Sequence, residues 1–375
     1  MAMKRTLPAI FARGGTSNGL VLMKDHLPPV QEWHKILPAA MGSPDPYGRQ
    51  LNGLGSGISS TSKICVLSPT SRPDADIEFT FVQVGIKDGS LDMAGNCGNM
   101  SSIVGPVGLD EGLIQKPKIE PAGKDSASPT ALVRVFNTNT NKVIHSRFSV
   151  CGTPPRYQPE GDYQMDGVPG TQSKITLSFV NPGGAKTGYT LPTGNRIDTL
   201  TLPDGTTIQA SLVDVSNPGV FIRLSDLGVA NPHSLSPVDV EADAGLKARL
   251  EQIRQAGAKM MGLDPKTESV PKIVLIFPSS STLGDPHLHI KCQALSMGQA
   301  HKAVPLTLAL CLGAAVRIAG TIPNLLATRD NSGDSVVIGH PTGRVEVGTT
   351  MQDGDILSAE LHRTARVLMK GDVFY

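Results

Sequence analysis

Two stretches of this chain are apolar on almost every side of a helix. Residues 99–114 and 299–319 consist largely of Ala, Gly, Val and Leu, and neither stretch keeps a continuous polar face at 3.6 residues per turn. A helix that is apolar all round is buried all round. Each stretch therefore predicts a central helix with other structure wrapped around it.

The segments available to surround these helices are typical of strands. Short runs rich in Val, Ile, Phe and Thr alternate with turns supplied by 40 glycines and 29 prolines, and the clearest runs are 77–86, 130–138, 174–182, 208–216 and 272–280. Two ordinary helices are predicted at 30–42 and 238–262. The pattern indicates an α/β (α+β) protein.

The two apolar helices also suggest an internal repeat. Pro106 follows Cys97 by nine residues, and Pro305 follows Ser296 by nine residues. A chain of 375 residues is long enough for two domains, and the Gly/Pro/Thr-rich segment 181–195 is the predicted join. We expect the N-termini of both helices to face each other across a cleft, where free backbone N–H groups would bind carboxylates.

Charge and cysteine usage narrow the class of protein. A formal net charge of +1 gives no global field for nucleic acid or a membrane surface, although it allows a small anionic substrate. The five cysteines show no CxxC pair and no metal-ligand spacing, which suits free thiols in a reducing compartment. No apolar run approaches the roughly 18 residues of a membrane span. We expect a cytoplasmic protein with no metal.

Cys97 lies between two Asn–Gly pairs in the sequence GNCGN, just before the first apolar helix. Thiols at helix N-termini ionise readily, so Cys97 is a candidate acid or base, with Asn96, Gly98 and Asn99 as candidate binding residues. The competing interpretation is a small buried hydrophobic residue. We expect that ordinary fate for the other cysteines, which are Cys65, Cys151, Cys292 and Cys311.

Lys63 follows the glycine- and serine-rich loop of GLGSGISSTSK and opens an apolar strand. A lysine that is partly desolvated at the mouth of a strand can carry protons. The alternative is an ordinary surface lysine. From the local sequence both interpretations stay open.

Two further segments offer polar groups for a carboxylate. In FARGGTSNGLVL, the candidates are Arg13, Thr16 and Ser17, and the alternative is a plain β-hairpin turn. The segment lacks the spacing of a phosphate loop. Near the second apolar helix, the candidates are Ser296, Met297, Gly298 and His301. Of these, His301 by itself is more typical of a structural histidine.

Several motifs occur in a fixed order along nearly the whole chain: RGGTSNG, MGSPD, GLGSGISSTSK, GNCGN, SMGQAHKAVPLTLALC and RTARVLMKG. This ordered set resembles the 2-methylaconitate cis-trans isomerase (PrpF-like) family, which shares the diaminopimelate epimerase fold. The resemblance implies two similar domains, each a β-barrel-like sheet around a central buried helix. They would span residues 1–185 and 186–375, with the last strand a candidate to cross back to the first domain.

The resemblance also implies an activity. Family members isomerise unsaturated tricarboxylic acids such as 2-methylaconitate or aconitate without a cofactor, by removing one proton and adding another. Lys63 and Cys97 match the expected acid–base positions, and Ser17 matches a binding position. The expected partner is a small tricarboxylate, and a homodimer is left open as the assembly.

Two departures from the family pattern bear on which acid fits. Asn18 replaces the lysine of the family's usual GGTSKG, and the second-motif loop reads GLGSGIS in place of the usual pair of glycines after GMG or GIG. Ser296 stands where a symmetric two-thiol racemase would need its second cysteine, which argues against such a racemase. Two alternatives stay open. One alternative is a tautomerase of keto-acids such as 4-oxalomesaconate. The other is a non-catalytic relative that binds a carboxylate.

Overall fold

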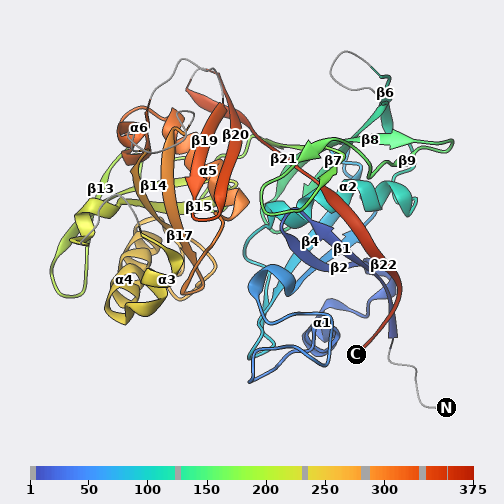
Figure 1. Cartoon of the computed structure of the whole chain (residues 1–375), viewed down its shortest axis with the longest axis horizontal. Coiled ribbons are helices and arrows are strands. Elements are labelled where there is room, and N and C mark those ends of the chain that lie inside the picture. Colours follow the sequence, from blue (N-terminus) through green and yellow to red (C-terminus); the bar gives the residue numbers. More distant parts are fainter. Residues whose placement is uncertain (1–5, 123–127, 230–234, 280–287, 329–334, 353) are drawn as a thin grey trace. The chain divides into compact units, whose positions relative to one another are not determined.

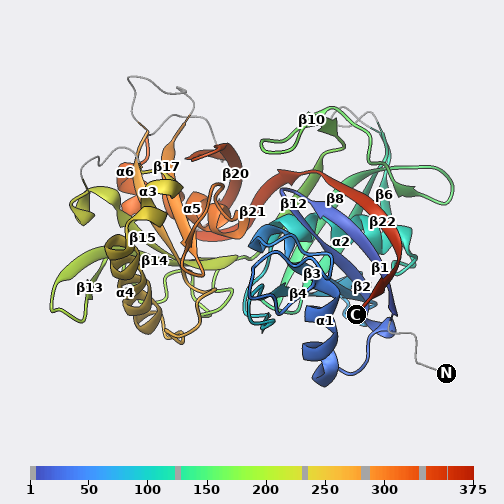
Figure 2. The same ribbon diagram turned by 60° about the horizontal axis from the view of Figure 1, so that its bottom comes forward.

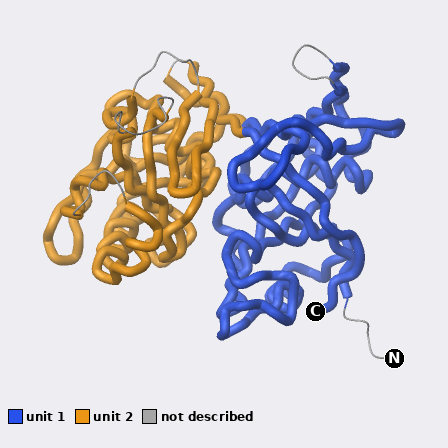
Figure 3. Tube along the Cα trace, in the orientation of Figure 1, with its two compact units in different colours: residues 1–178, 362–375 blue, residues 179–361 orange. Residues whose placement is uncertain are grey.

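A computed structural model describes residues 6–122, 128–229, 235–279, 288–328, 335–352 and 354–375. The chain divides into two compact units (Figure 3). Unit 1 comprises residues 1–178 and 362–375, and unit 2 comprises residues 179–361.

Unit 1 is built on one continuous series of paired strands. Neighbours pair in the order β22, β1, β2, β3, β4, β7 and β8; β2–β3 and β4–β7 are parallel, and the other pairs are antiparallel. These strands are β1 (Thr6–Gly14), β2 (Ser17–Met23), β3 (Lys63–Ser68), β4 (Ile77–Val84), β7 (Thr130–Asn137), β8 (Lys142–Cys151) and β22 (Ala365–Phe374). The last strand of the chain thus pairs with the first. Shorter strands are β5 (Leu91–Asp92), β6 (Lys118–Glu120), β9 (Arg156–Tyr157), β10 (Tyr163–Gln164), β11 (Thr171–Gln172) and β12 (Ile175–Val180).

Helix α2 (Gly98–Asp110) lies inside these strands and packs against β1, β2, β3, β4, β7, β8, β9 and β22 (Figures 1 and 2). All its residues except Asn99 and Asp110 are buried. The prediction of a central buried helix here is confirmed. Close approach of helix and sheet needs a small residue, and a Cβ on Gly105 would lie 2.8 Å from Ser146 Oγ.

The opposite face of the same sheet is covered by α1 (Trp33–Met41). Trp33, Ile36 and Leu37 of this helix share one buried cluster with Ile64 and Val66 of β3. Because side chains alternate along a strand, the other β3 residues point to the α2 side. Three short 3₁₀ helices complete the unit: η1 (Lys24–His26), η2 (Val30–Glu32) and η3 (Ser59–Thr61).

Unit 2 repeats this plan with different lengths. Its strands pair in the order β13, β14, β15, β16, β17, β19, β20 and β21; β15–β16 and β17–β19 are parallel, and the other pairs are antiparallel. They are β13 (Asp198–Thr201), β14 (Thr207–Val215), β15 (Asn217–Arg223), β16 (Lys272–Pro278), β17 (Ile290–Ser296), β19 (Ser335–His340), β20 (Gly343–Gln352) and β21 (Asp355–Arg363), with β18 (Gln299–Ala300) as a short addition. The last two residues of β21, His362 and Arg363, belong to unit 1. The predicted runs 77–86, 130–138, 174–182, 208–216 and 272–280 all contain strands and are confirmed.

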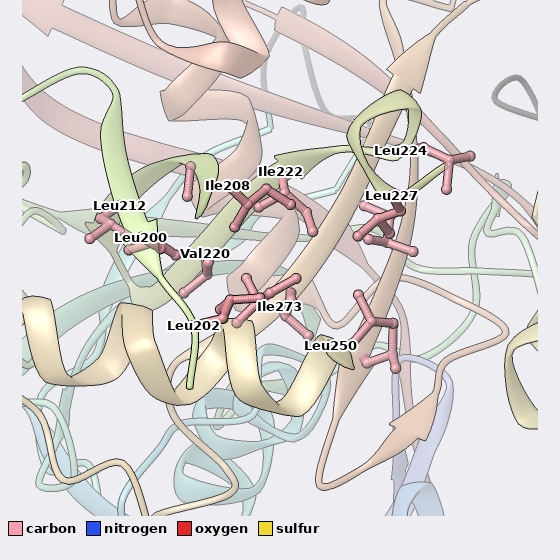
Figure 4. Packing of buried hydrophobic residues seen from close by; sticks show 14 of the residues in the cluster. Leu200, Leu202, Ile208, Leu212, Val220, Ile222, Leu224, Leu227, Leu250 and Ile273 are labelled. Atoms are coloured by element: carbon pink, nitrogen blue, oxygen red, sulfur yellow. The ribbon is translucent and has the colours of Figure 1, made fainter. Parts of the chain in front are cut away.

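Helix α5 (Leu306–Arg317) packs against β14, β15, β19 and β20, and its residues 306–315 are all buried. The outer face of unit 2 is covered by α4 (Ala244–Met260), whose Leu250 and Ile253 join a cluster with Ile273 and Leu275 of β16 (Figure 4). The remaining helices are α3 (Pro237–Ala242), α6 (Ile322–Leu326) and the 3₁₀ helix η4 (Leu224–Leu227).

Two predicted helices differ from the observed ones. The predicted helix 238–262 is divided, because Asp243 ends α3 and its side chain caps α4 by accepting the Leu246 N–H. The predicted helix 299–319 begins only at Leu306, since residues 299–300 form β18 and Pro305 is the N-cap. The predicted repeat aligned Cys97 with Ser296 and Pro106 with Pro305, and this alignment of the two halves is wrong. Pro106 lies within α2, whereas Pro305 lies just before α5.

The two buried helices align correctly when their first residues are matched. Cys97 caps α2 and Pro305 caps α5, so Gly105 and Gly313 are each the eighth residue of their helix. A Cβ on Gly313 would lie 2.4 Å from Val347 of β20, as one on Gly105 would meet β8. No helix among the described residues is long and apolar enough to cross a membrane.

Candidate active site

Lys63 begins β3 on the face that points toward α2. Its neighbour Ile64 belongs to the α1 cluster, so Lys63 and Cys65 lie on the other face of the strand. Only 9% of Lys63 is exposed, and its Nζ lies 5.2 Å from the centre of the Phe81 ring. The surface-lysine alternative is therefore wrong.

Gln83 of β4 stands directly opposite Lys63 and accepts a hydrogen bond from Lys63 Nζ through Oε1. The amide cannot turn over freely, because its Nε2 donates to the carbonyls of Ser59 (3.1 Å) and Ser62 (2.9 Å). Gln83 thus fixes an acceptor in front of the ammonium group. Sequence reasoning missed this residue, although a polar side chain on the face of β4 that carries Phe79 and Phe81 was an available signal.

Cys97 is the N-cap of α2 and is partly exposed. Its backbone is extended, its side chain makes no capping hydrogen bond, and its carbonyl accepts from the Ser101 N–H at 2.9 Å. Burial raises the pKa of the neighbouring Cys65 thiol; a charge on Cys97 raises it further, and the Lys63 ammonium opposes the rise. Lys63 and Cys97 thus both act electrostatically on the same buried thiol.

The glycine-rich segment after Arg13 is a tight turn that contacts the start of α2. Gly14 pairs with Ser17, leaving Gly15 and Thr16 as the turn, so the predicted β-hairpin is confirmed. Gly15 has a φ of +54°, and a Cβ there would lie 2.0 Å from Asn99 Oδ1. Asn99 Nδ2 in turn donates to Thr16 Oγ1 at 3.1 Å and to Ser17 Oγ at 3.3 Å.

These contacts bring the candidates of unit 1 together at the first turn of α2. Ser17 and Asn96 are buried, and the Asn96 Oδ1 lies 3.2 Å from the Ser101 hydroxyl. The first four N–H groups of a helix have no partner within it and attract anions. Gly98 and Asn99, the first two residues of α2, supply such groups next to the Thr16–Ser17 turn.

Arg13 is already occupied by partners within the protein. Its guanidinium donates to the Gly15 carbonyl at 2.7 Å, to the Thr364 carbonyl and hydroxyl at 3.0 Å each, and to the side chain of Gln172. Burial lowers the pKa of Arg13. These contacts anchor the turn, and the bidentate pairing of Arg13 with a ligand carboxylate stays a prediction.

The candidates of unit 2 form a hairpin. Met297 and Gly298 have φ values of +52° and +66° and make the two-residue turn between β17 and β18. The expectation that Ser296 starts the buried helix is wrong, because α5 begins at Leu306. A cavity of about 40 Å³ beside the turn is lined partly by Leu250 and Arg254 of α4. His301 follows β18, and its N–H donates to the Ala294 carbonyl at 2.9 Å.

Four other cysteines were expected to be buried. Cys65, Cys292 and Cys311 are buried, and burial raises the pKa of each thiol. Cys151 is exposed, so that prediction was wrong at the end of β8, where the alternation points the side chain outward. A cavity of about 450 Å³ beside Cys151 contains neither Lys63 nor Cys97.

The described residues contain no group of three His, Cys, Asp or Glu side chains arranged to hold a metal ion. The features that the described part of unit 1 does bring together are a half-buried thiol, a buried lysine and a helix N-terminus. This set can hold an anion and exchange protons with it.

The fold has counterparts among solved structures. A methylitaconate-delta-isomerase structure matches with a TM-score of 0.79 and 34% identity, covering 99% of this chain and 96% of the other. A hydroxyproline epimerase from Agrobacterium vitis matches with a TM-score of 0.57, covering 100% of this chain and 94% of the other; at 14% identity it shows the fold alone. The chain thus has a mixed α/β, epimerase-type fold.

The family model of the PrpF protein matches residues 3–375, and the chain belongs to this family. The 3-methylitaconate isomerase of Eubacterium barkeri is 34% identical over 100% of this chain and 98% of its own length. The 2-methyl-aconitate isomerase of Cupriavidus necator is 33% identical over 97% and 96%, and the 4-oxalomesaconate tautomerase of Pseudomonas putida is 32% identical over 98% and 95%. The protein is an isomerase.

Proposed function

We propose that this isomerase acts on unsaturated tricarboxylic acids of the 2-methylaconitate or aconitate type and needs no cofactor. The names of its relatives support an unsaturated acid as substrate. The observation that carries the proposal is that Lys63 is buried on the face of β3 that packs against α2, and that Cys97 is the N-cap of this same helix. The residues proposed to bind the acid are Thr16, Ser17, Asn96, Gly98 and Asn99, with Ser296, Met297, Gly298 and His301 as a second group.

The chemistry needs one group to take a proton and one to give a proton. The base removes a hydrogen from a carbon next to the double bond, and the negative charge spreads into a carboxylate. The acid then protonates a different carbon, so that the double bond moves or changes geometry. Positioned acid–base groups contribute on the order of 10²–10⁴-fold to such a step. The N–H groups at the start of α2 stabilise the charge that develops on the carboxylate oxygens.

Lys63 and Cys97 differ in how they are prepared for this work. The Gln83 amide aims Lys63, whereas Cys97 carries no capping bond and its side chain is partly exposed to a ligand. After one turnover the two groups have exchanged protonation states, and protons from solvent reset them. Turnover in heavy water therefore places deuterium in the product.

A second candidate is a tautomerase of the 4-oxalomesaconate type. The 32% identity to such an enzyme over 98% of this chain favours it, and the same two groups would serve a different carbon acid. A third interpretation is a relative that binds carboxylates without catalysis.

The decisive experiment is NMR of purified protein in D₂O with trans-aconitate, 2-methylaconitate and 4-oxalomesaconate in parallel. We expect deuterium incorporation and isomerisation of an aconitate, and neither in Lys63→Ala or Cys97→Ala. Faster turnover of oxalomesaconate would replace the proposal with the tautomerase. Binding of an acid without deuterium incorporation in any of the three would support the non-catalytic interpretation.

A further inference from the structure

Arg363, the last residue of β21, is a buried cation without a carboxylate partner. Only 7% of it is exposed, and its one hydrogen bond is from a terminal nitrogen to the adjacent His362 carbonyl at 2.7 Å. Its Nε has no hydrogen-bond partner, and none of the ion pairs between described residues includes it. Burial lowers the pKa of Arg363 to about 10.

The strand pairing places Arg363 beside the glycine turn. Gly14 of β1 pairs with Ala365, and the Gly15 N–H donates to the Thr364 carbonyl at 2.9 Å. Arg363 is the residue before Thr364, one position beyond this contact. Arg363 is therefore next to the segment that contacts the start of α2.

Alternation along the strand fixes the side on which Arg363 lies. A Cβ on Gly14 would meet the backbone of Asn99 and Met100, so the face shared by Gly14 and Ala365 is the α2 face. Burial alternates along β21 up to Arg363, with Leu361 and Arg363 buried and His362 partly exposed, so Arg363 lies on the buried side of its own strand, and Ala365 begins the next strand.

The residues on either side of Arg363 support this assignment. The side chains of His362 and Thr364 lie on the opposite face, where His362 contacts the Tyr163 ring and Thr364 accepts from Arg13. Arg363 thus lies on the buried side of the segment that joins β21 to β22, two residues from the Gly14–Ala365 pair.

A buried charge without a partner is costly for the protein alone. Desolvation of an ion costs several kcal/mol, and a guanidinium usually recovers that cost by pairing with a carboxylate. Among the described residues no carboxylate pairs with Arg363, while the helix N-terminus in the same unit also favours an anion. A carboxylate brought by a ligand would satisfy both.

We propose that Arg363 binds a carboxylate of the substrate at the N-terminal end of α2. The inference rests on the proposed function in that the ligand is an unsaturated polycarboxylic acid. It adds a binding residue that stands at the other end of the chain from Arg13, Lys63 and Cys97. Charge-assisted bonds to a guanidinium contribute enough that their loss weakens binding about 10- to 100-fold.

The test is equilibrium binding of propane-1,2,3-tricarboxylate, a saturated acid that the proposed proton transfer cannot isomerise. We expect Arg363→Gln to raise its Kd at least tenfold, and Arg363→Lys to raise it less because the charge stays. Arg366→Gln removes the same charge from an exposed position three residues along and is expected to bind like the parent. Because Arg363 has no counter-ion in the free protein, Arg363→Gln should keep or raise the thermal unfolding midpoint.

Unchanged binding in Arg363→Gln, or a parent protein that does not bind the acid, would overturn the inference. A second result would also overturn it. If both Arg363 variants unfold at a lower temperature than the parent while Arg363→Lys keeps the parent's Kd, the role of Arg363 is structural. The two proposals fail separately. If Arg363→Gln turns over an aconitate with the same KM as the parent, only the role of Arg363 is refuted. If binding of the acid depends on Arg363 but the parent turns over none of the acids, only the proposed isomerase activity is refuted.

Discussion

The two units of this chain share one plan but not one chemistry. In each, two antiparallel strands lead through a covering helix (α1 or α4) to a parallel third strand, and a buried helix follows the fourth. Lys63 begins β3 opposite Gly19, and Lys272 begins β16 opposite Gly219. The two lysines therefore occupy matching places, yet their surroundings differ.

The differences lie around the lysines and at the helix starts. Lys63 faces Gln83, whereas the matching position across from Lys272 is Ser296, and the Lys272 Nζ donates to the Ser269 carbonyl at 2.8 Å. Cys97 caps α2, whereas Pro305 caps α5. Both units keep the same order of strands and the same buried helix because both must bury a core. The catalytic side chains proposed for unit 1 stand at a few positions that do not determine this packing. Four predictions test this comparison.

The largest effect is expected from the catalytic pair. Lys63→Ala and Cys97→Ala should each lower kcat/KM for the best substrate by about 10²-fold or more, the usual range for a lost acid or base. Lys272→Ala is the matched control from unit 2 and should keep the rate of the parent. Steady-state kinetics decides this, and equal losses in Lys63→Ala and Lys272→Ala would show that the two units do not differ in the way described.

The two helix glycines should show the shared plan as a loss of stability. Gly105→Ala and Gly313→Ala push a methyl group into β8 and β20, at a cost of about 1–3 kcal/mol each in free energy of unfolding. Gly313→Ala should cost more, because its Cβ would lie 2.4 Å from Val347, against 2.8 Å from Ser146 for Gly105. Urea unfolding measures both, with Gly371→Ala, whose Cβ meets nothing, as control. A harmless Gly313→Ala would refute the helix register.

Gln83→Leu should sharpen the contrast between the two lysines. Without the amide, Lys63 loses its fixed acceptor, and kcat should fall about tenfold with little change in KM, since misplacement of a catalytic group slows the chemical step. Thr80→Val, on the opposite face of the same strand, serves as control. A rise in KM with constant kcat would assign Gln83 to substrate binding instead.

The effect that is smallest at neutral pH concerns the buried thiols, which change stability only in alkaline solution. Burial raises the pKa of Cys292 to about 12, above the unfolded value near 8.5, so the unfolded state loses its proton first. The protonated Cys292 thiol therefore makes its full contribution to the free energy of unfolding below about pH 8.5. This contribution declines by about 1.4 kcal/mol per pH unit as the pH rises toward 12. Cys292→Ala should flatten the alkaline loss of stability, and Cys151→Ser, at an exposed thiol, should not. Identical pH profiles for the two variants would contradict this.

Local sequence patterns were sufficient for much of the fold. The run 77–86 begins with alternating apolar and polar residues, and 272–280 contains a short continuous apolar run rich in β-branched residues; both patterns are typical of strands. The apolar stretch 99–114 has almost no polar face, which predicts a buried helix. The GNCGN and GGTS motifs also marked the turn and the helix start that now lie together. These features are encoded within a few neighbouring residues, so they can be predicted without knowing the rest of the chain.

Other features depend on which distant segments become neighbours. The strand that carries Gln83 lies opposite Lys63, and the end of the chain returns Arg363 to the turn after Arg13, although 350 positions separate the two arginines in the sequence. The start of α5 was predicted too early because residues 299–305 carry no local signal that separates them from the helix, whereas in the structure Gln299 pairs with Ser296 in a hairpin. Composition sets which residues must be buried, but strand pairing decides which side chains meet, because a hydrogen-bonded ladder joins positions that no local pattern relates.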